Sequence, residues 1–151
     1  MSLADQIQTD LTTAMKARDK VRTTTLRSVL AGIKNLRAEA GRGDRDIADA
    51  EVVDIISREA KKRRESIQTY ADNDRPELAE AEQAELDVLT RYLPEQMDEA
   101  AIRAVVDQTV SEVGATGPGD LGKVMGALMP KVKGKADGKL VNTIVRQALN
   151  D

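Results

Sequence analysis

Apolar residues recur every three or four positions along almost the whole chain. This spacing places them on one face of an α-helix, whereas a half-buried strand needs strict alternation, which no window shows. We therefore predict an all-α fold. Among the 151 residues, 40% are apolar, yet there is no Phe or Trp and there are two Tyr, so the core must be aliphatic. The length suits one domain or two small ones.

An N-terminal unit of four helices is predicted within residues 1–94. The helices are expected to begin after Ser2, near Asp19, near Ala48 or Asp49, and at Pro76, since these residues favour helix starts. The loops "GRGDRD" and "ADNDRP" separate the later helices. The residues expected to face inward are Leu3, Ile7, Leu11, Met15, Leu26, Val29, Ile33, Leu36, Val53, Ile56, Ala60, Ile67, Tyr70, Leu78, Ala81, Leu89, Tyr92 and Leu93.

A C-terminal unit of three shorter helices is predicted within residues 95–151. Asp98 caps the fifth helix and Gly114 ends it, Asp120 caps the sixth and Pro130 stops it, and Asp137 caps the seventh. The residues expected to face inward are Ile102, Val105, Val106, Val110, Val113, Leu121, Val124, Met125, Leu128, Leu140, Val141, Ile144, Val145 and Leu149.

The composition excludes several kinds of chemistry. Cysteine and histidine are both absent, so disulfides, thiol nucleophiles, the usual zinc sites and imidazole catalysis are excluded. We therefore expect no catalytic residue, no metal and no cofactor. The start "MSLADQIQTD" does not resemble a signal peptide, and no stretch approaches the length of a transmembrane helix. A cytoplasmic protein without membrane contact is the expectation.

Charge is distributed unevenly along the chain. Residues 1–120 carry 17 Lys and Arg against 24 Asp and Glu, whereas residues 121–151 carry 6 against 2. A basic end on an acidic chain can bind an anionic partner, but it can also be only a solvated helix surface. Both interpretations remain open at this stage.

The stretch "GKVMGALMPKVKGKADGKLVNTIV" at 122–145 concentrates glycine and lysine. A phosphate-binding loop of the Walker type needs G-x-x-x-x-G-K-[ST] between a strand and a helix, and neither the final Ser or Thr nor the strand is present. Gly122 and Gly126 share one face of the sixth helix. We predict that this face packs closely against the seventh helix, with a flat surface for a ligand backbone as the alternative.

Four lysines surround the turn before the seventh helix: Lys131, Lys133, Lys135 and Lys139. Lysines beside a helix N-terminus suit phosphodiester oxygens. With so few aromatic residues, base stacking is a poor fit, which leaves recognition of the backbone and shape of a folded RNA. The residues alone do not decide between this site and a solvated surface.

The run "REAKKRRES" contains one arginine that falls among apolar arcs. Arg63 lies between the arcs of Ile56, Ile67 and Tyr70 in helical projection. On the fourth helix, Glu85 lies within the inward arc and Glu82 lies at its edge. We predict an interhelical ion pair from Arg63 to Glu85 or Glu82. The alternative, a metal or acid–base carboxylate pair, is disfavoured because such sites in helical bundles usually add histidine.

The segment "LGKVMGALMPKVKGKADGKLVNTIVRQAL" resembles the GatB/YqeY domain, the helical tail of the B subunit of the glutamine-dependent tRNA amidotransferase. Upstream, "MKARDKVRTTTLRSVLAGIKN", "KKRRESIQTYA" and "AEQAELDVLTRYLPEQM" resemble stand-alone YqeY proteins. The resemblance implies a four-helix unit followed by a three-helix unit, and a tail that contacts tRNA rather than performing chemistry. The contact positions that it implies are Lys123, Lys131, Lys133, Lys135, Lys139 and Asn142.

Three functions are therefore carried forward. The first is a non-catalytic accessory protein that binds tRNA or another folded RNA. The second is an adaptor that docks on amidotransferase subunits or another translation enzyme. The third is a carbon–nitrogen ligase with glutamine as amide donor, which is the least favoured because cysteine, histidine and a nucleotide loop are missing.

Overall fold

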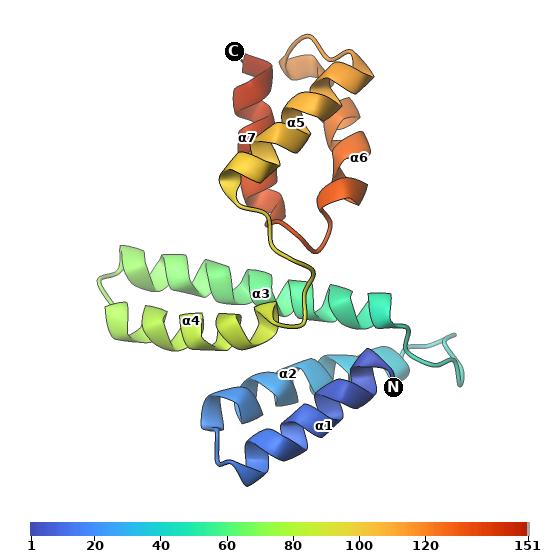
Figure 1. The fold of residues 1–151 in the computed structure, drawn as a ribbon, viewed down its shortest axis with the longest axis vertical. Coiled ribbons are helices and arrows are strands. Elements are labelled where there is room, and N and C mark those ends of the chain that lie inside the picture. The colour runs from blue at the N-terminus through green and yellow to red at the C-terminus, as the bar shows by residue number, and fades with distance from the viewer. Residues whose placement is uncertain (151) are drawn as a thin grey trace. The chain divides into compact units, whose positions relative to one another are not determined.

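The computed structural model describes residues 1–150, and within them the chain is helical with no strand (Figure 1). The all-α prediction is confirmed. In chain order the elements are α1 (Leu3–Lys16), α2 (Lys20–Arg37), α3 (Asp49–Asp72), α4 (Pro76–Thr90), α5 (Glu99–Val113), the short 3₁₀ helix η1 (Pro118–Asp120), α6 (Leu121–Val132) and α7 (Gly138–Asn150).

The chain divides into two compact units, Met1–Leu93 and Pro94–Asp151. The division falls one residue before the boundary expected from the sequence. The first unit contains α1–α4 and the second contains α5–α7. Each has its own cluster of buried aliphatic side chains, and the two clusters share no residue.

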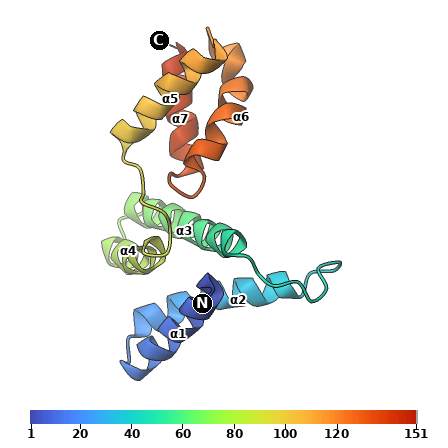
Figure 2. The ribbon, with the colours of Figure 1, turned by 45° about the vertical axis from the view of Figure 1, so that its right-hand side comes forward.

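The first unit consists of two helical hairpins, α1 with α2 and α3 with α4 (Figure 2). Ile7, Leu26, Ile56 and Leu89, one from each helix, are fully buried between them. The hairpins approach closely at Gly32 of α2, where an added Cβ would lie 2.8 Å from a methyl carbon of Ile55. Glycine is required there because a larger side chain would push α2 away from α3.

The second unit is a three-helix bundle. Its core is formed mainly by Ile102 and Val106 of α5, Leu128 of α6 and Ile144 of α7, all essentially inaccessible to solvent. Because α7 presents Val141, Ile144, Val145 and Leu149 at helical spacing, it buries one sharply defined face.

Several predicted helix ends are confirmed. The Ser2 hydroxyl accepts from Asp5 N at 3.1 Å within a capping box, Asp19 accepts from Arg22 N at 3.1 Å, and Asp98 accepts from Ala101 N at 2.8 Å. Gly114 adopts a left-handed φ of 67° at the end of α5. These ends were predictable because capping depends on residues close in sequence.

The predicted C-terminal end of α6 is wrong, whereas Asp120 is the N-cap residue as predicted, although its side chain makes no capping hydrogen bond. Pro130 does not stop this helix but lies inside its last turn, and the helix continues to Val132, which is fully buried and so holds the turn in place. At the other end, the carboxylate of Asp120 does not cap α6. It accepts from Thr116 N at 2.8 Å instead, because η1 turns the chain immediately before the helix.

Four residues predicted to face inward are exposed instead. The exposed fraction is 49% for Met15, 41% for Leu78 and 39% for Leu140, and Ala81 is exposed as well. The buried positions in their place include Ala14 on α1, Val52 and Ile55 on α3 in place of Val53, and Leu86 and Val88 on α4. In α4 the buried residues gather in the C-terminal half, whereas Leu78 and Ala81 lie near the α3–α4 turn.

No helix within residues 1–150 is long and apolar enough to cross a membrane.

Candidate nucleic-acid interface

The turn between α6 and α7 is a compact backbone loop. Gly134 takes a left-handed φ of 77°, and the carbonyl oxygen of Val132 accepts from Lys135 N at 2.9 Å and from Ala136 N at 3.1 Å. Asp137 accepts from Lys139 N at 3.3 Å, so its carboxylate bonds an amide at the start of α7. The side chains of Lys133, Lys135 and Lys139 are exposed around this loop. We call Lys133, Lys135 and Lys139, together with the loop that carries them, the lysine turn.

The segment before α5 is hydrogen-bonded to the lysine turn. The side-chain amide of Gln96 donates to the carbonyl of Gly134 at 2.9 Å, and Met97 N donates to the carbonyl of Lys135 at 2.8 Å. Lys135 also lines an open groove of about 580 Å³ together with Glu95 and Asp98. The two carboxylates offset part of its positive charge, so Lys135 attracts an anion less strongly than its position on the turn alone suggests.

Lys131 lies in a different environment from the other lysines. Its Nζ donates to Glu112 Oε2 at 2.8 Å and to Thr109 Oγ1 at 3.1 Å, both on α5. The hydrogen bond and positive charge of Lys131 lower the pKa of Glu112. A phosphate group must therefore compete with a carboxylate for Lys131.

Lys123 and Asn142, the other two positions that the resemblance implies, are not part of the lysine turn. Lys123 precedes Lys131 by eight positions on α6, a distance of about 12 Å along the helix axis. Asn142 lies in the early part of α7, where its Oδ1 accepts from Arg146 Nε at 2.7 Å. Arg146 is an exposed cation that the sequence reasoning missed, although its i, i+4 spacing from Asn142 could have identified it.

The predicted packing of Gly122 and Gly126 against α7 is wrong. A Cβ added at either glycine would meet nothing within 4 Å. The core-facing side of α6 carries Val124, Leu128 and Val132, and the two glycines lie on the opposite side. Both glycines are exposed, and the alternative stated for them, a flat surface for a ligand backbone, stays a prediction.

Arg63 lies at the centre of a carboxylate cluster between α3 and α4. Its Nε is 3.0 Å from Glu85 Oε2 and 3.9 Å from Glu82 Oε2, the two partners expected from the sequence, and its Nη1 is 2.7 Å from Glu59 Oε2. Glu59, on the same helix as Arg63, was not anticipated. Burial and the charge of Glu85 raise the pKa of Glu82, while Arg63 opposes that shift. This geometry is that of an interhelical ion pair.

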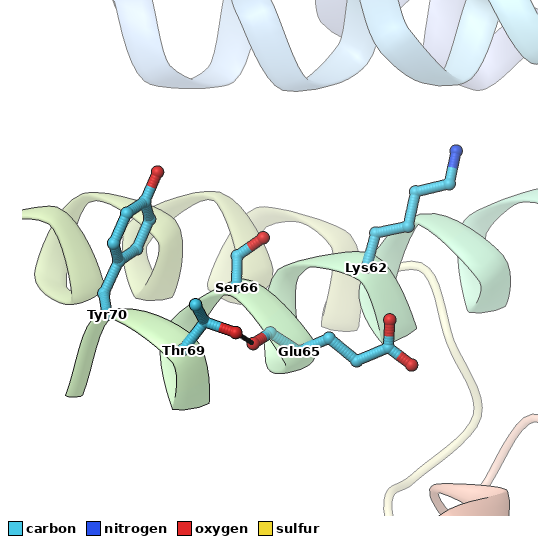
Figure 3. A pocket seen from close by; sticks show the side chains of 5 residues that line it. All are labelled: Lys62, Glu65, Ser66, Thr69 and Tyr70. Carbon is cyan, nitrogen blue, oxygen red and sulfur yellow. Dashed lines mark hydrogen bonds between the residues drawn. The ribbon is translucent and has the colours of Figure 1, made fainter. Parts of the chain in front are cut away.

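A second surface feature is an open groove of about 450 Å³ along α3 (Figure 3). Lys62, Ser66 and Tyr70 point to the same side of the helix there, whereas Thr69 donates to the carbonyl of Glu65 at 3.0 Å. The cation in this groove, Lys62, pairs with Glu59 at 3.4 Å. Among residues 1–150 no group of three His, Cys, Asp or Glu side chains is placed so that it could hold a metal ion.

An all-helical chain with an exposed cationic turn belongs to the broad class of small helical proteins with a charged surface site. The sequence model of the family described as Yqey-like protein matches residues 4–149. The chain therefore belongs to the YqeY-like family, as the resemblance predicted.

Relatives of two kinds are found. The "Altered inheritance of mitochondria protein 41, mitochondrial" of Lachancea thermotolerans is 32% identical over 114 residues, which cover 74% of this chain and 60% of that protein. The protein with the same name from Pyrenophora tritici-repentis is 30% identical over 95% of this chain and 79% of its own length.

The second kind is a much larger protein. The E subunit of the glutamyl-tRNA(Gln) amidotransferase of Thermococcus gammatolerans is 42% identical over 76 residues, which cover 50% of this chain and 12% of that larger protein. Half of this chain thus corresponds to a small part of a protein named for amidation of tRNA.

Proposed function

We propose that this protein is a non-catalytic accessory protein that binds tRNA or another folded RNA through the lysine turn. The observation that carries the proposal is the exposure of Lys133, Lys135 and Lys139 on one short loop at the N-terminal end of α7. Lysines add sequence-independent attraction to a phosphate backbone, and the positive dipole end of α7 favours an anion, although the carboxylate of Asp137 already accepts from Lys139 N there.

Two further features support the proposal. The exposed glycines of α6, Gly122 and Gly126, leave the helix without side chains on that side, so an RNA backbone could approach closely. In addition, a relative's name refers to a tRNA substrate, and it is 42% identical to half of this chain. The cytoplasmic location stays a prediction, since other relatives are named as mitochondrial.

The test replaces Lys133, Lys135 and Lys139 together with Ala and measures the binding of total deacylated tRNA across a salt series. We expect a loss of about tenfold or more in affinity at low salt, and a decrease of about two in the slope of log K against log salt. The matched control replaces three exposed lysines of the first unit, Lys16, Lys20 and Lys34. If both triple variants bind like the wild type, the lysine turn is not an RNA site.

A second candidate is an adaptor that docks on amidotransferase subunits or another translation enzyme. It is favoured by the match between half of this chain and 12% of an amidotransferase component, since a segment that is part of one larger enzyme suits docking on similar enzymes. Co-purification of tagged protein with amidotransferase subunits that survives nuclease treatment would support it. Loss of the complex on nuclease treatment would favour the RNA-binding function.

The third candidate, a carbon–nitrogen ligase with glutamine as amide donor, rests on the family relation alone. The part of the amidotransferase relative that this chain matches is 12% of that protein. If the purified chain alone amidated misacylated tRNA with glutamine as the donor, the ligase would become the favoured one of the three candidate functions.

A further inference from the structure

Gln96 connects the segment before α5 to the lysine turn. The two hydrogens of its side-chain amide are both used: one bonds the carbonyl of Pro94 at 2.7 Å and the other bonds the carbonyl of Gly134 at 2.9 Å. One position further, Met97 N bonds the carbonyl of Lys135 at 2.8 Å. Two consecutive carbonyls of the turn therefore face the same short segment of chain.

These bonds add to the two that the turn makes within itself, from Lys135 N and Ala136 N to the carbonyl of Val132. Gly134 lies at its centre with a left-handed φ, and glycine is the residue that loses most backbone freedom when its conformation is fixed. Lys133 and Lys135 flank this glycine, so the positions of their Cα atoms depend on its conformation. Bonds from Gln96 and Met97 select one conformation and hence one spacing of the lysines.

We infer that Gln96 is a positioning residue of the RNA site, which holds the lysine turn in the shape that binds phosphate. The inference rests on the proposed function. It assigns residues 94–97 to the binding site although none of their side chains is cationic. A site that is ordered before binding loses less conformational freedom on association, and it binds more tightly for that reason.

The test uses the full chain with Gln96→Ala and with Gln96→Glu, which keeps the length of the side chain but removes its donor. Total deacylated tRNA is the probe. We expect affinity to fall by about fivefold through lost preorganisation, and the salt slope to fall by about one phosphate contact. The melting temperature should fall only slightly, because a part-buried hydrogen bond is lost while the two hydrophobic cores are untouched. Amide hydrogen exchange at Lys135 and Ala136 should become faster in the absence of RNA.

The matched control is Gln83→Ala on α4, an exposed glutamine whose amide bonds Asp87 at 2.9 Å. It should leave affinity, salt slope and exchange of the turn unchanged. Wild-type affinity and slope in both Gln96 variants, while the triple lysine variant loses binding, would overturn the inference alone. If the wild type shows no salt-dependent RNA binding, the proposed function and this inference both fail. This holds even if amide exchange of the turn is faster in the Gln96 variants than in the wild type.

Discussion

Single side chains determine how much of the cationic surface is available to a ligand. Lys131 was predicted as one of the RNA contacts, yet in the structure it is paired with Glu112 and Thr109. The i, i+4 rule can identify partners on the same helix, but it cannot identify a carboxylate on a neighbouring helix. Under the proposed function, Glu112 would compete with phosphate for this lysine.

Removing the charge of Glu112 is therefore expected to strengthen RNA binding. Glu112→Gln leaves Lys131 without its ionic partner, so we expect affinity for tRNA to rise by roughly threefold and the salt slope to increase by up to about one contact. Glu99→Gln is the control, since Glu99 lies on the same helix and pairs with Arg103 at 2.7 Å. Equal effects of the two substitutions would show that net charge, rather than release of Lys131, is responsible.

Tyr92 provides a pH-dependent contribution to stability in the first unit. Its hydroxyl donates to Asp10 Oδ2 at 2.6 Å, and burial together with this hydrogen bond raises the pKa of Tyr92 from 10.0 to about 12. The folded chain thus holds the phenolic proton more tightly than the unfolded chain. The stabilisation is complete below pH 10 and is lost as the pH rises through 12.

We expect Tyr92→Phe to lower the urea midpoint at pH 8, and the difference from the wild type to disappear as the pH approaches 12. Urea unfolding at a series of pH values from 8 to about 12 measures this difference. Tyr70→Phe leaves the bond to Asp10 in place, so it should show the same decline with pH as the wild type. A constant difference across the pH range would mean that the phenol titrates equally in both states.

At the scale of helices, the residue at which a helix begins was predictable from the sequence, whereas the side of the helix that is buried was less predictable. Caps such as Ser2 and Asp98 act on residues within one turn, so short sequence motifs identify them. Met15 and Leu78 fit the helical period but are exposed, because the period defines an arc and the neighbouring helices decide which part of it is covered. The period also placed Arg63 near Glu85, since both lie in the arcs that face each other.

The site was less predictable than the fold. The lysine turn follows from lysines between two helices, but Gln96 carries no sequence signal because its partners are backbone carbonyls 38 and two positions away. Gly122 and Gly126 are compatible with close packing and with open exposure alike. Only the arrangement of α6 against its neighbours decides between these outcomes.

Two helical glycines in different surroundings give a paired prediction. Gly126→Ala should stabilise the second unit by about 1 kcal/mol, because alanine is the better helix former and its Cβ would meet open space. Gly32→Ala should destabilise the first unit by roughly 1–3 kcal/mol, because its Cβ would overlap Ile55. Thermal or urea unfolding of the two variants measures both effects. Destabilisation by Gly126→Ala would show that this side of α6 is packed.

At the scale of the whole molecule, two separate hydrophobic cores suggest two folding units. The core of residues 1–93 and that of residues 94–151 have no member in common. The three-helix unit is small, and small domains bury a lower fraction of their surface. We expect its stability to be modest but sufficient for independent folding.

A chain limited to residues 94–151 is therefore expected to fold alone and to bind tRNA within about threefold of the affinity of the full chain, since the lysine turn and Gln96 both lie in it. Circular dichroism, thermal melting and the same salt series test this expectation. The complementary chain 1–93 is the control and should fold without binding. An unfolded 94–151 chain, or equal binding by 1–93, would contradict the prediction.

The position of Pro130 inside α6 changes the hydrogen bonding of the helix. Proline has no N–H, so the carbonyl four residues earlier, that of Gly126, lacks its usual helical donor. Gly126 also has no side chain, and a Cβ added there would meet nothing within 4 Å. The ladder of helical hydrogen bonds therefore leaves one carbonyl of α6 to be satisfied by a donor from outside the ladder. Under the RNA-binding function proposed above, a ribose 2′-hydroxyl, which deoxyribose lacks, is a donor that suits this oxygen.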